Sequence, residues 1–402
     1  MSLANGRHYF AIPGPSVVPD RVLAAMHRPS PNIYAGELVE LTQTIFADLR
    51  RVACSSGHAA IYIANGHGAW EAAISNMFSR GDKALGAITG HFGRGWVEWA
   101  RRMGIDMETI EFPGSTAIDP ARIEEALVAD RSHRIRAVLV THVDTASTVR
   151  NDIEAVRAAI DAARHPALLA VDAIASLGCE ELLFDAWGID VLIAASQKGL
   201  MLPPGLSFLW FSDKALAASH EANLVTPYWD WKPRSSSAEL YRYFAGTAPT
   251  HHLYGLREAL TMILEEEGLA NVWGRHRRLA RAVWEAFDTW GKGGDIGLNV
   301  PDPAARAHAV TSARVGAGGA LQLRQWLEAE AGVTLGIGLG MALPTEPAYN
   351  DFFRVAHMGH VNSHMTLGVL AAMDAGFKAL GIRHGTGALD AAAAALAQGA
   401  AE

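Results

Sequence analysis

Between residues 60 and 212, short apolar runs alternate with helix-like segments, and this alternation constrains the fold more than any other feature. Runs that are mostly apolar along their length indicate strands buried on both faces of a sheet. Amphipathic stretches such as residues 152–165 separate most of them. Because strand–helix–strand units build parallel sheets, we predict an α/β fold with a mostly parallel sheet. The predicted strands are residues 60–64, 84–89, 136–143, 167–175, 190–196 and 206–212.

From about residue 267 the pattern changes. A long helix-like segment at 270–290 leads into a stretch near 292–303 that contains glycine and proline. The later residues mix strand-like and helix-like segments in a smaller unit, which is typical of an α+β domain. The predicted elements there are a strand in 308–315, a helix in 320–332, a strand in 352–359 and an alanine-rich helix over 389–402.

The length of 402 residues exceeds what one ordinary hydrophobic core supports. Half of the residues are hydrophobic and 19% are charged, which is typical of a globular protein. We therefore predict an N-terminal arm over 1–17, a large domain over 18–266 and a small C-terminal domain over 267–402.

Charge and cysteine content narrow the class of protein. The net charge is −8 and there is no run of lysine or arginine, so nucleic-acid binding is not expected. The two cysteines, Cys54 and Cys179, indicate a reducing compartment rather than a disulfide framework. No long uncharged apolar stretch and no signal-like start is seen, so we expect a cytoplasmic protein without a membrane partner.

Lys198 stands alone among small and apolar residues in "AASQKGLMLPPGL" (194–206). It follows a predicted strand, at the carboxyl edge where open α/β sheets bind ligands. Lysine is seldom buried unless it is paired or takes part in chemistry. A surface lysine at a strand end is the alternative, and these residues alone leave both readings open.

Asp172, in "LLAVDAIAS", ends the preceding predicted strand. An acid and an amine at neighbouring strand ends suit pyridoxal 5'-phosphate, whose aldehyde forms a Schiff base with lysine. Its pyridine nitrogen needs a carboxylate so that the ring can act as an electron sink. The alternative is that Asp172 caps the next helix.

The segment "IANGHGAWEAAISNMF" has the features of a phosphate cup. A strand ends, Gly66 and Gly68 leave the backbone bare, and an amphipathic helix begins. Backbone N–H groups at a helix N-terminus bind phosphate. Glu71 occupies the sixth position where a dinucleotide fingerprint needs glycine, and 336–341 fails the same test, so a dinucleotide enzyme is poorly supported.

Together these residues resemble the class V branch of the fold-type I pyridoxal-phosphate aminotransferases, and within it the alanine–glyoxylate and serine–glyoxylate aminotransferase group. The resemblance covers almost the whole chain. It implies a fold-type I transferase that forms a homodimer with shared active sites. The matching motifs are "PGPSVVPDRVLAAM" (13–26), "NGHGAWEAAISN" (65–76), "TGHFGRG" (89–95), "THVDTAST" (141–148), "VDAIASLG" (171–178), "GIDVLIAASQKGLMLPPGL" (188–206), "LYGLREAL" (253–260) and "FFRVAHMG" (352–359).

The resemblance assigns roles residue by residue. Lys198 is expected to be the Schiff-base lysine and proton carrier, and Asp172 to pair with the pyridine nitrogen. The other cofactor contacts it implies are Ile174 beneath the ring, Phe92 stacked on it, Thr145 beside it, Gly66, His67 and Gln197 at the phosphate, and Thr247 at the phosphate of the partner's site.

On the substrate side, Arg354 matches the arginine that holds the substrate carboxylate, for which a guanidinium fork is well suited. A surface ion pair is the alternative. Tyr34 is expected to approach the partner's site. Two positions depart from the family: Phe244 replaces a tyrosine that reaches the partner's phosphate, and Thr148 stands where glycine is common.

The resemblance implies transfer of an amino group from a small amino acid, such as alanine or serine, to a small 2-oxo acid, such as glyoxylate or pyruvate. A single evident carboxylate anchor, Arg354, favours small substrates over dicarboxylic ones. A lyase or a pyridoxamine–pyruvate aminotransferase stays open, and so does a non-catalytic binding protein. A cysteine desulfurase is disfavoured because both cysteines precede residue 180.

His357, His360 and His364 have spacings that resemble metal-ligand spacing. No acidic or cysteine cluster accompanies them, so we expect no metal site.

Overall fold

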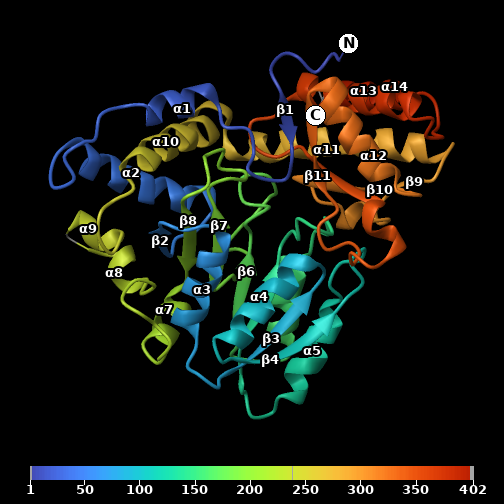
Figure 1. The fold of residues 1–402 in the computed structure, drawn as a ribbon. Coiled ribbons are helices and arrows are strands. Elements are labelled where there is room, and N and C mark those ends of the chain that lie inside the picture. Colours follow the sequence, from blue (N-terminus) through green and yellow to red (C-terminus); the bar gives the residue numbers. More distant parts are fainter. Residues whose placement is uncertain (1, 238, 399–402) are drawn as a thin grey trace.

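The computed structural model describes residues 2–237 and 239–398, which form two sheets with helices packed against them (Figure 1). A seven-stranded sheet runs through the middle and lower part of the view, and a five-stranded sheet lies at the upper right near the amino terminus. The prediction of an α/β fold with a large, mostly parallel sheet is confirmed.

The large sheet has the strand order β2-β8-β7-β6-β5-β3-β4. Only β8 runs antiparallel to its neighbours. All six predicted strands occur, and one was missed: β4 is an edge strand whose charged residues hide the apolar pattern. The strands are β2 (His58–Tyr62), β3 (Lys83–Ile88), β4 (Asp106–Glu111), β5 (Ile135–Thr141), β6 (Leu168–Asp172), β7 (Val191–Ala195) and β8 (Ser207–Phe211).

Helices cover both faces of this sheet, because successive strand residues point to opposite sides. In β5, Val138 and Val140 pack into one core and Ala137 and Leu139 into another. The first core contains α1 (Asp20–Met26), α2 (Glu37–Val52), α5 (Pro120–Ala129), α6 (Ile153–Ala162) and α10 (Thr250–Thr261); the second contains α3 (Gly66–Met77), α4 (His91–Arg102) and α7 (Asp213–Ser219).

The small sheet has the order β1-β11-β12-β10-β9. Its first strand comes from the predicted N-terminal arm and pairs parallel with β11, so the start of the chain is tied to the C-terminal part. The domain boundaries themselves stay a prediction. The strands are β1 (Tyr9–Ala11), β9 (Ile296–Leu298), β10 (Val310–Val315), β11 (Val333–Ile337) and β12 (Phe352–Ala356); the helices are α11 (Leu269–Gly291), α12 (Gly319–Trp326), α13 (Ser363–Ala379) and α14 (Ala388–Gln398).

The predicted helix at 320–332 starts as α12 and continues as a π-helix over Leu327–Ala331. The predicted alanine-rich helix is α14, while residues 399–402 lie outside the described residues. The remaining short elements are α8 (Lys232–Ser235), α9 (Leu240–Tyr243), a π-helix over Met262–Glu267, and 3₁₀ turns over Pro303–Ala305 and Pro347–Asn350.

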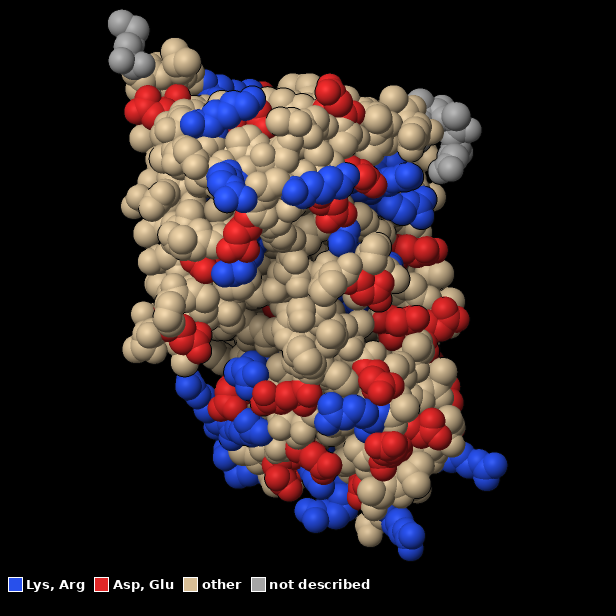
Figure 2. All heavy atoms as spheres, turned by 90° about the vertical axis from the view of Figure 1, so that its right-hand side faces the viewer, with Lys and Arg blue, Asp and Glu red and all other residues tan. Residues whose placement is uncertain are grey.

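Charged residues of both signs are interspersed on the face shown in Figure 2, and mostly uncharged residues surround the hollow across its middle. Among the described helices, none has the length and apolar run needed to cross a bilayer.

Candidate active site

Asp172 and Lys198 lie at neighbouring strand ends, as predicted. Asp172 is the last residue of β6, which pairs in parallel with β7, and Lys198 follows the end of β7. Both side chains are buried. Since β6 and β7 point the same way, the carboxyl edge of the sheet brings an acid and an amine together.

The carboxylate of Asp172 is held from two sides. Its Oδ2 accepts a hydrogen bond of 2.8 Å from Trp70 Nε1, and its Oδ1 accepts one of 2.8 Å from the backbone N–H of Ile174. Burial raises the pKa of Asp172 to about 7, although the two hydrogen bonds oppose that shift. A buried carboxylate with a raised pKa favours a cationic or donating partner at this edge. Trp70 was missed, because nothing in the pattern of α3 distinguished it from an ordinary core residue.

The Lys198 amine points toward the N-terminal segment, where Nζ donates to the Pro13 carbonyl. The backbone around it is fixed by Ser16, whose Oγ donates to the Lys198 carbonyl at 2.8 Å and whose N–H donates to the Gln197 carbonyl at 2.9 Å. Burial, and to a smaller extent the charge of Arg354, lower the pKa of Lys198 to about 8. A larger share of the amine is therefore neutral, and so nucleophilic, than for a solvated lysine.

Asp144 ties the turn after β5 to the N-terminus of α4. Its carboxylate accepts from the backbone N–H groups of Phe92 (2.8 Å), Gly93 (3.0 Å), Ala146 (3.0 Å) and Ser147 (3.4 Å). These bonds fix Phe92 on α4 relative to the neighbouring Thr145, which is buried. Sequence analysis did not single out Asp144, because its partners lie on two separate segments.

Thr148 has a left-handed backbone, with φ of 63°. A β-branched residue adopts this conformation only with strain, which the glycine expected from the resemblance would avoid. Its hydroxyl compensates in part, since Oγ1 accepts from the Ser312 N–H of β10 at 3.2 Å.

Arg354 lies on the β12 face opposite the helices. Phe353 and Val355 point into the helix-covered core, so the alternation of the strand turns Arg354 the other way. Its Nε donates to the Ile337 carbonyl at 2.7 Å and its Nη1 to the Thr145 carbonyl at 2.8 Å. It forms no ion pair within the described residues, which argues against the surface-ion-pair alternative. Burial lowers the pKa of Arg354 to about 10, so it stays charged near neutrality.

A cavity of about 380 Å³ is lined by residues from both the large-sheet and the small-sheet parts of the chain. It joins three predicted site residues, Lys198, Phe92 and Arg354, and one that was not predicted, Arg324 of α12. Its lining residues are Ile12, Pro13, Gly14, Phe92, Lys198, Arg324, Thr334, Leu335, Gly336, Ile337, Leu339 and Arg354.

The predicted phosphate cup is the start of α3. The side chain of Asn65 caps this helix and accepts from the N–H groups of His67 (3.1 Å) and Gly68 (3.3 Å). A phosphate bound by the His67 N–H therefore has to displace this cap. A Cβ at Gly66 would lie 2.5 Å from Ile174 Cδ1, so a larger residue there would push the end of the Ile174 side chain aside. The Oε1 of Gln197 is buried and accepts no hydrogen bond from the described residues.

Other predicted residues lie away from the cavity. Tyr34 and Thr247 are exposed and line no part of it, so their expected contacts with a partner stay predictions. Phe244, which stands where the resemblance implies a tyrosine, is buried in the first core of the large sheet.

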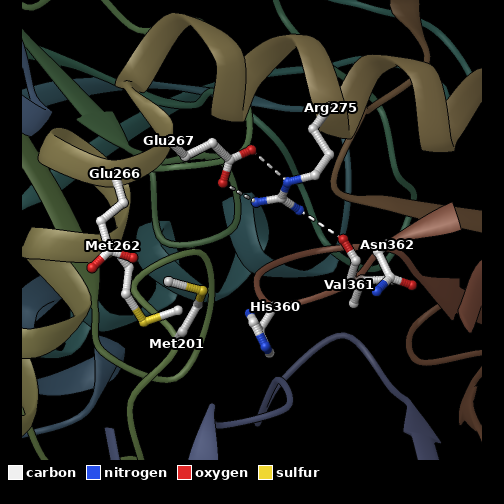
Figure 3. A pocket seen from close by; sticks show the side chains of 8 residues that line it. All are labelled: Met201, Met262, Glu266, Glu267, Arg275, His360, Val361 and Asn362. Carbon is white, nitrogen blue, oxygen red and sulfur yellow. Dashed lines mark hydrogen bonds and ion pairs between the residues drawn. The ribbon is translucent and has the colours of Figure 1, made fainter. Parts of the chain in front are cut away.

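The three histidines at 357, 360 and 364 do not converge. His357 is buried, with Nδ1 2.6 Å from the His308 carbonyl oxygen and Nε2 2.9 Å from Thr311 Oγ1. His360 lines a separate pocket beside Arg275, which Glu267 and the Val361 carbonyl hold in place (Figure 3). Within the described residues, no cluster of three or more potential metal ligands occurs.

Comparison with known proteins shows which family the chain resembles in sequence and in structure. The family described as "Aminotransferase class-V" matches residues 8–363. Serine–glyoxylate aminotransferase of Methylorubrum extorquens is 38% identical, over 92% of this chain and 90% of that protein. L-aspartate–glyoxylate aminotransferase of Paracoccus denitrificans is 34% identical, over 92% and 91%. The crystal structure of pyridoxamine–pyruvate aminotransferase from Mesorhizobium loti has a TM-score of 0.85 at 25% identity and covers 97% of each chain.

Proposed function

The chain belongs to the class V aminotransferase family, and on this premise we propose that it moves the amino group of a small amino acid, such as serine or alanine, to a small 2-oxo acid, such as glyoxylate or pyruvate. It is a pyridoxal-phosphate-dependent aminotransferase. The observation that carries the proposal is the single cavity that holds both Lys198 and Arg354, an amine and a carboxylate anchor. The relatives named for glyoxylate support the choice of acceptor.

The residues at the sheet edge fit pyridoxal phosphate, which when bound supplies an electron sink for the substrate's α-carbon. Asp172 is a buried carboxyl whose pKa is raised by burial, so a cationic partner such as a protonated pyridine nitrogen would stabilise its ionised form, and Gln197 holds a buried, unpartnered oxygen. Gly66 leaves the backbone open beside Ile174. We assign the cofactor to Lys198, Asp172, Ile174, Phe92, Thr145, Gly66, His67 and Gln197.

The chain's own side chains bind the substrate, transfer the proton and limit the entry of water. Arg354 uses two N–H groups on protein carbonyls, which leaves three of its five donors for the substrate's α-carboxylate. That anchor orients the Cα–H bond. Lys198 Nζ, whose lowered pKa makes the neutral amine accessible, takes the α-proton and returns it. The apolar lining from Ile12, Leu335 and Leu339 limits the entry of water.

We further propose that the protein is a cytoplasmic homodimer with shared active sites. Thr247 and Tyr34 are exposed in one protomer, as residues that reach across an interface have to be. Sedimentation of the cofactor-loaded protein tests whether it is a dimer. The Thr247→Ala variant is expected to retain the cofactor less tightly and to remain a dimer.

The absorption spectrum of the purified, cofactor-loaded protein tests the function, recorded before and after adding serine, alanine or aspartate. We expect a visible band that one donor bleaches, and formation of glycine when glyoxylate is then added. A protein that takes up no cofactor would support a non-catalytic role. A band that no donor bleaches would point to a lyase. Loss of cofactor on gel filtration, with turnover of free pyridoxamine and pyruvate, would favour the activity named for the Mesorhizobium loti structure.

A further inference from the structure

A second arginine lies in the same cavity as Arg354. Arg324 comes from α12 and lines the cavity together with Lys198 and Arg354. Its side chain is half-buried, and its Nε is buried without a hydrogen-bond partner. Within residues 2–237 and 239–398, its guanidinium forms no hydrogen bond and no ion pair. A buried Nε–H that is left without an acceptor calls for an explanation from a ligand.

The two arginines also repel each other. Burial lowers the pKa of Arg324, and its charge contributes to the lowered pKa of Arg354. Glu328, on the following turn, favours the charged form of Arg324 but is exposed and makes no ion pair with it. The charge of Asp144 favours the cationic form of Arg354, but among the described residues no carboxylate bonds to either arginine.

The chemistry of the cavity restricts what pairs with Arg324. Arg354 is already assigned to the substrate's α-carboxylate, and the other lining residues are mostly apolar. A volume of about 380 Å³ is within the ordinary range for small-molecule sites. The side chain of serine or alanine would leave Arg324 unpaired, whereas a second carboxylate matches its planar, charged donors.

We propose that Arg324 binds the side-chain carboxylate of a dicarboxylic amino donor, aspartate or glutamate, and so widens the donor range beyond monocarboxylic amino acids. This rests on the proposed aminotransferase function and sharpens its substrate class. It revises the expectation of a single carboxylate anchor, because the cavity contains two guanidinium groups at positions far apart in the sequence.

Arg324→Met tests the proposal, because it removes the charge and keeps an unbranched side chain. With glyoxylate as acceptor, kcat/KM for the preferred dicarboxylic donor is expected to fall about 10- to 100-fold, the range for a charged hydrogen bond. For serine and alanine the change is expected to stay below about threefold, since they do not reach Arg324. Arg324→Lys keeps a charge without the fork and is expected to be intermediate. Measuring aspartate and glutamate separately shows which side-chain length fits.

Arg277→Met is the matched control. Arg277 is an exposed arginine of α11 that does not line the cavity, so its loss is expected to leave kcat/KM unchanged for every donor. Equal losses for serine, alanine and aspartate in Arg324→Met would make Arg324 a structural residue and overturn the proposal.

Binding without turnover gives an independent readout. Calorimetry of the cofactor-loaded protein with succinate and with propionate compares two carboxylates with one. We expect Arg324→Met to weaken succinate about 10-fold or more and to leave propionate unchanged. Equal succinate affinity in wild type and variant would refute the role of Arg324. If wild type converts no donor at all, the proposed function fails, and succinate binding still decides the role of Arg324.

Discussion

The two sheets hold the charged groups of the candidate site in different ways. On the large sheet, Asp172 and Lys198 sit at the ends of buried parallel strands, and burial moves the pKa values of both toward neutrality, to about 7 and about 8. On the small-sheet side, Arg354 stays cationic with a pKa of about 10 and leans on two backbone carbonyls, while Arg324 has no protein partner within the described residues.

This difference separates the groups that exchange protons from the groups that bind the substrate's carboxylates. Groups that exchange protons need a pKa near the working pH, and burial in the large sheet supplies that. Groups that recognise carboxylates need a permanent charge and free donors, which arginine keeps even when buried. Variants on the large sheet are therefore expected to affect all donors alike. On the small-sheet side, Arg354 is proposed to hold the α-carboxylate that all donors share, so only variants of Arg324 are expected to distinguish between donors.

Lys198→Ala is expected to have the largest effect. Lys198 is the one lysine among the described residues that line the cavity, so no neighbouring amine replaces it. We expect kcat/KM to fall at least about 10³-fold with every donor. Lys292→Ala, at an exposed lysine after α11, is the control and is expected to retain full activity. Loss confined to one donor would break the division between the two sheets.

Arg354→Met is expected to rank second. Removing the proposed α-carboxylate anchor is expected to lower kcat/KM about 10²-fold for serine, alanine and aspartate alike. Because Arg354 also bonds the carbonyls of Ile337 and Thr145, thermal unfolding must be measured beside the kinetics. A loss as donor-dependent as that expected for Arg324→Met would mean that the two arginines have exchanged roles.

Asp172 is expected to make the cofactor-free protein less stable as pH rises. A carboxyl whose folded pKa is raised, here from 3.8 to about 7, contributes stability that is complete below its unfolded pKa and is lost as pH rises through the folded pKa. Between about pH 4 and 7 this costs roughly 3 kcal/mol. Buried histidines with lowered pKa values, such as His142 and His276, act in the opposite direction.

Comparison with Asp172→Asn isolates this contribution, because the histidines are common to both proteins. Urea unfolding at several pH values is expected to show the wild type falling relative to the variant across this range. Parallel pH curves would show that Asp172 is ionised at low pH, contrary to its buried setting.

Thr148 is expected to give the smallest effect, at the turn where the large sheet meets β10. Thr148→Ala keeps the left-handed conformation and loses the bond to Ser312, so we expect a loss of about 1–2 kcal/mol. Thr148→Gly also loses that bond but relieves about 1 kcal/mol of strain. Chemical denaturation should therefore rank glycine above alanine, and the reverse order would mean that the turn is not strained.

Local pattern was enough to predict the architecture and the neighbouring positions of Asp172 and Lys198. Apolar runs gave six of the seven strands of the large sheet, and the rule that ligands bind at carboxyl strand ends brought Asp172 and Lys198 together. The edge strand β4 was not predicted because its charged residues interrupt the apolar run. The roles of the site residues remain proposals, although the cavity joins Lys198, Phe92 and Arg354.

The sequence by itself therefore determined the succession of strands and helices along the chain and the chemistry available at one sheet edge. Both can be read from the sequence because periodicity and strand direction depend on neighbouring residues. Only the tertiary structure decided that Trp70 bonds Asp172, that Asp144 ties α4 to the turn carrying Thr145, and that Arg324 joins Arg354 in one cavity. Each of these contacts joins segments far apart in the chain. Such contacts depend on how helices pack on the two sheets. Neither of the two segments that such a contact joins shows a periodic sequence pattern that would predict it.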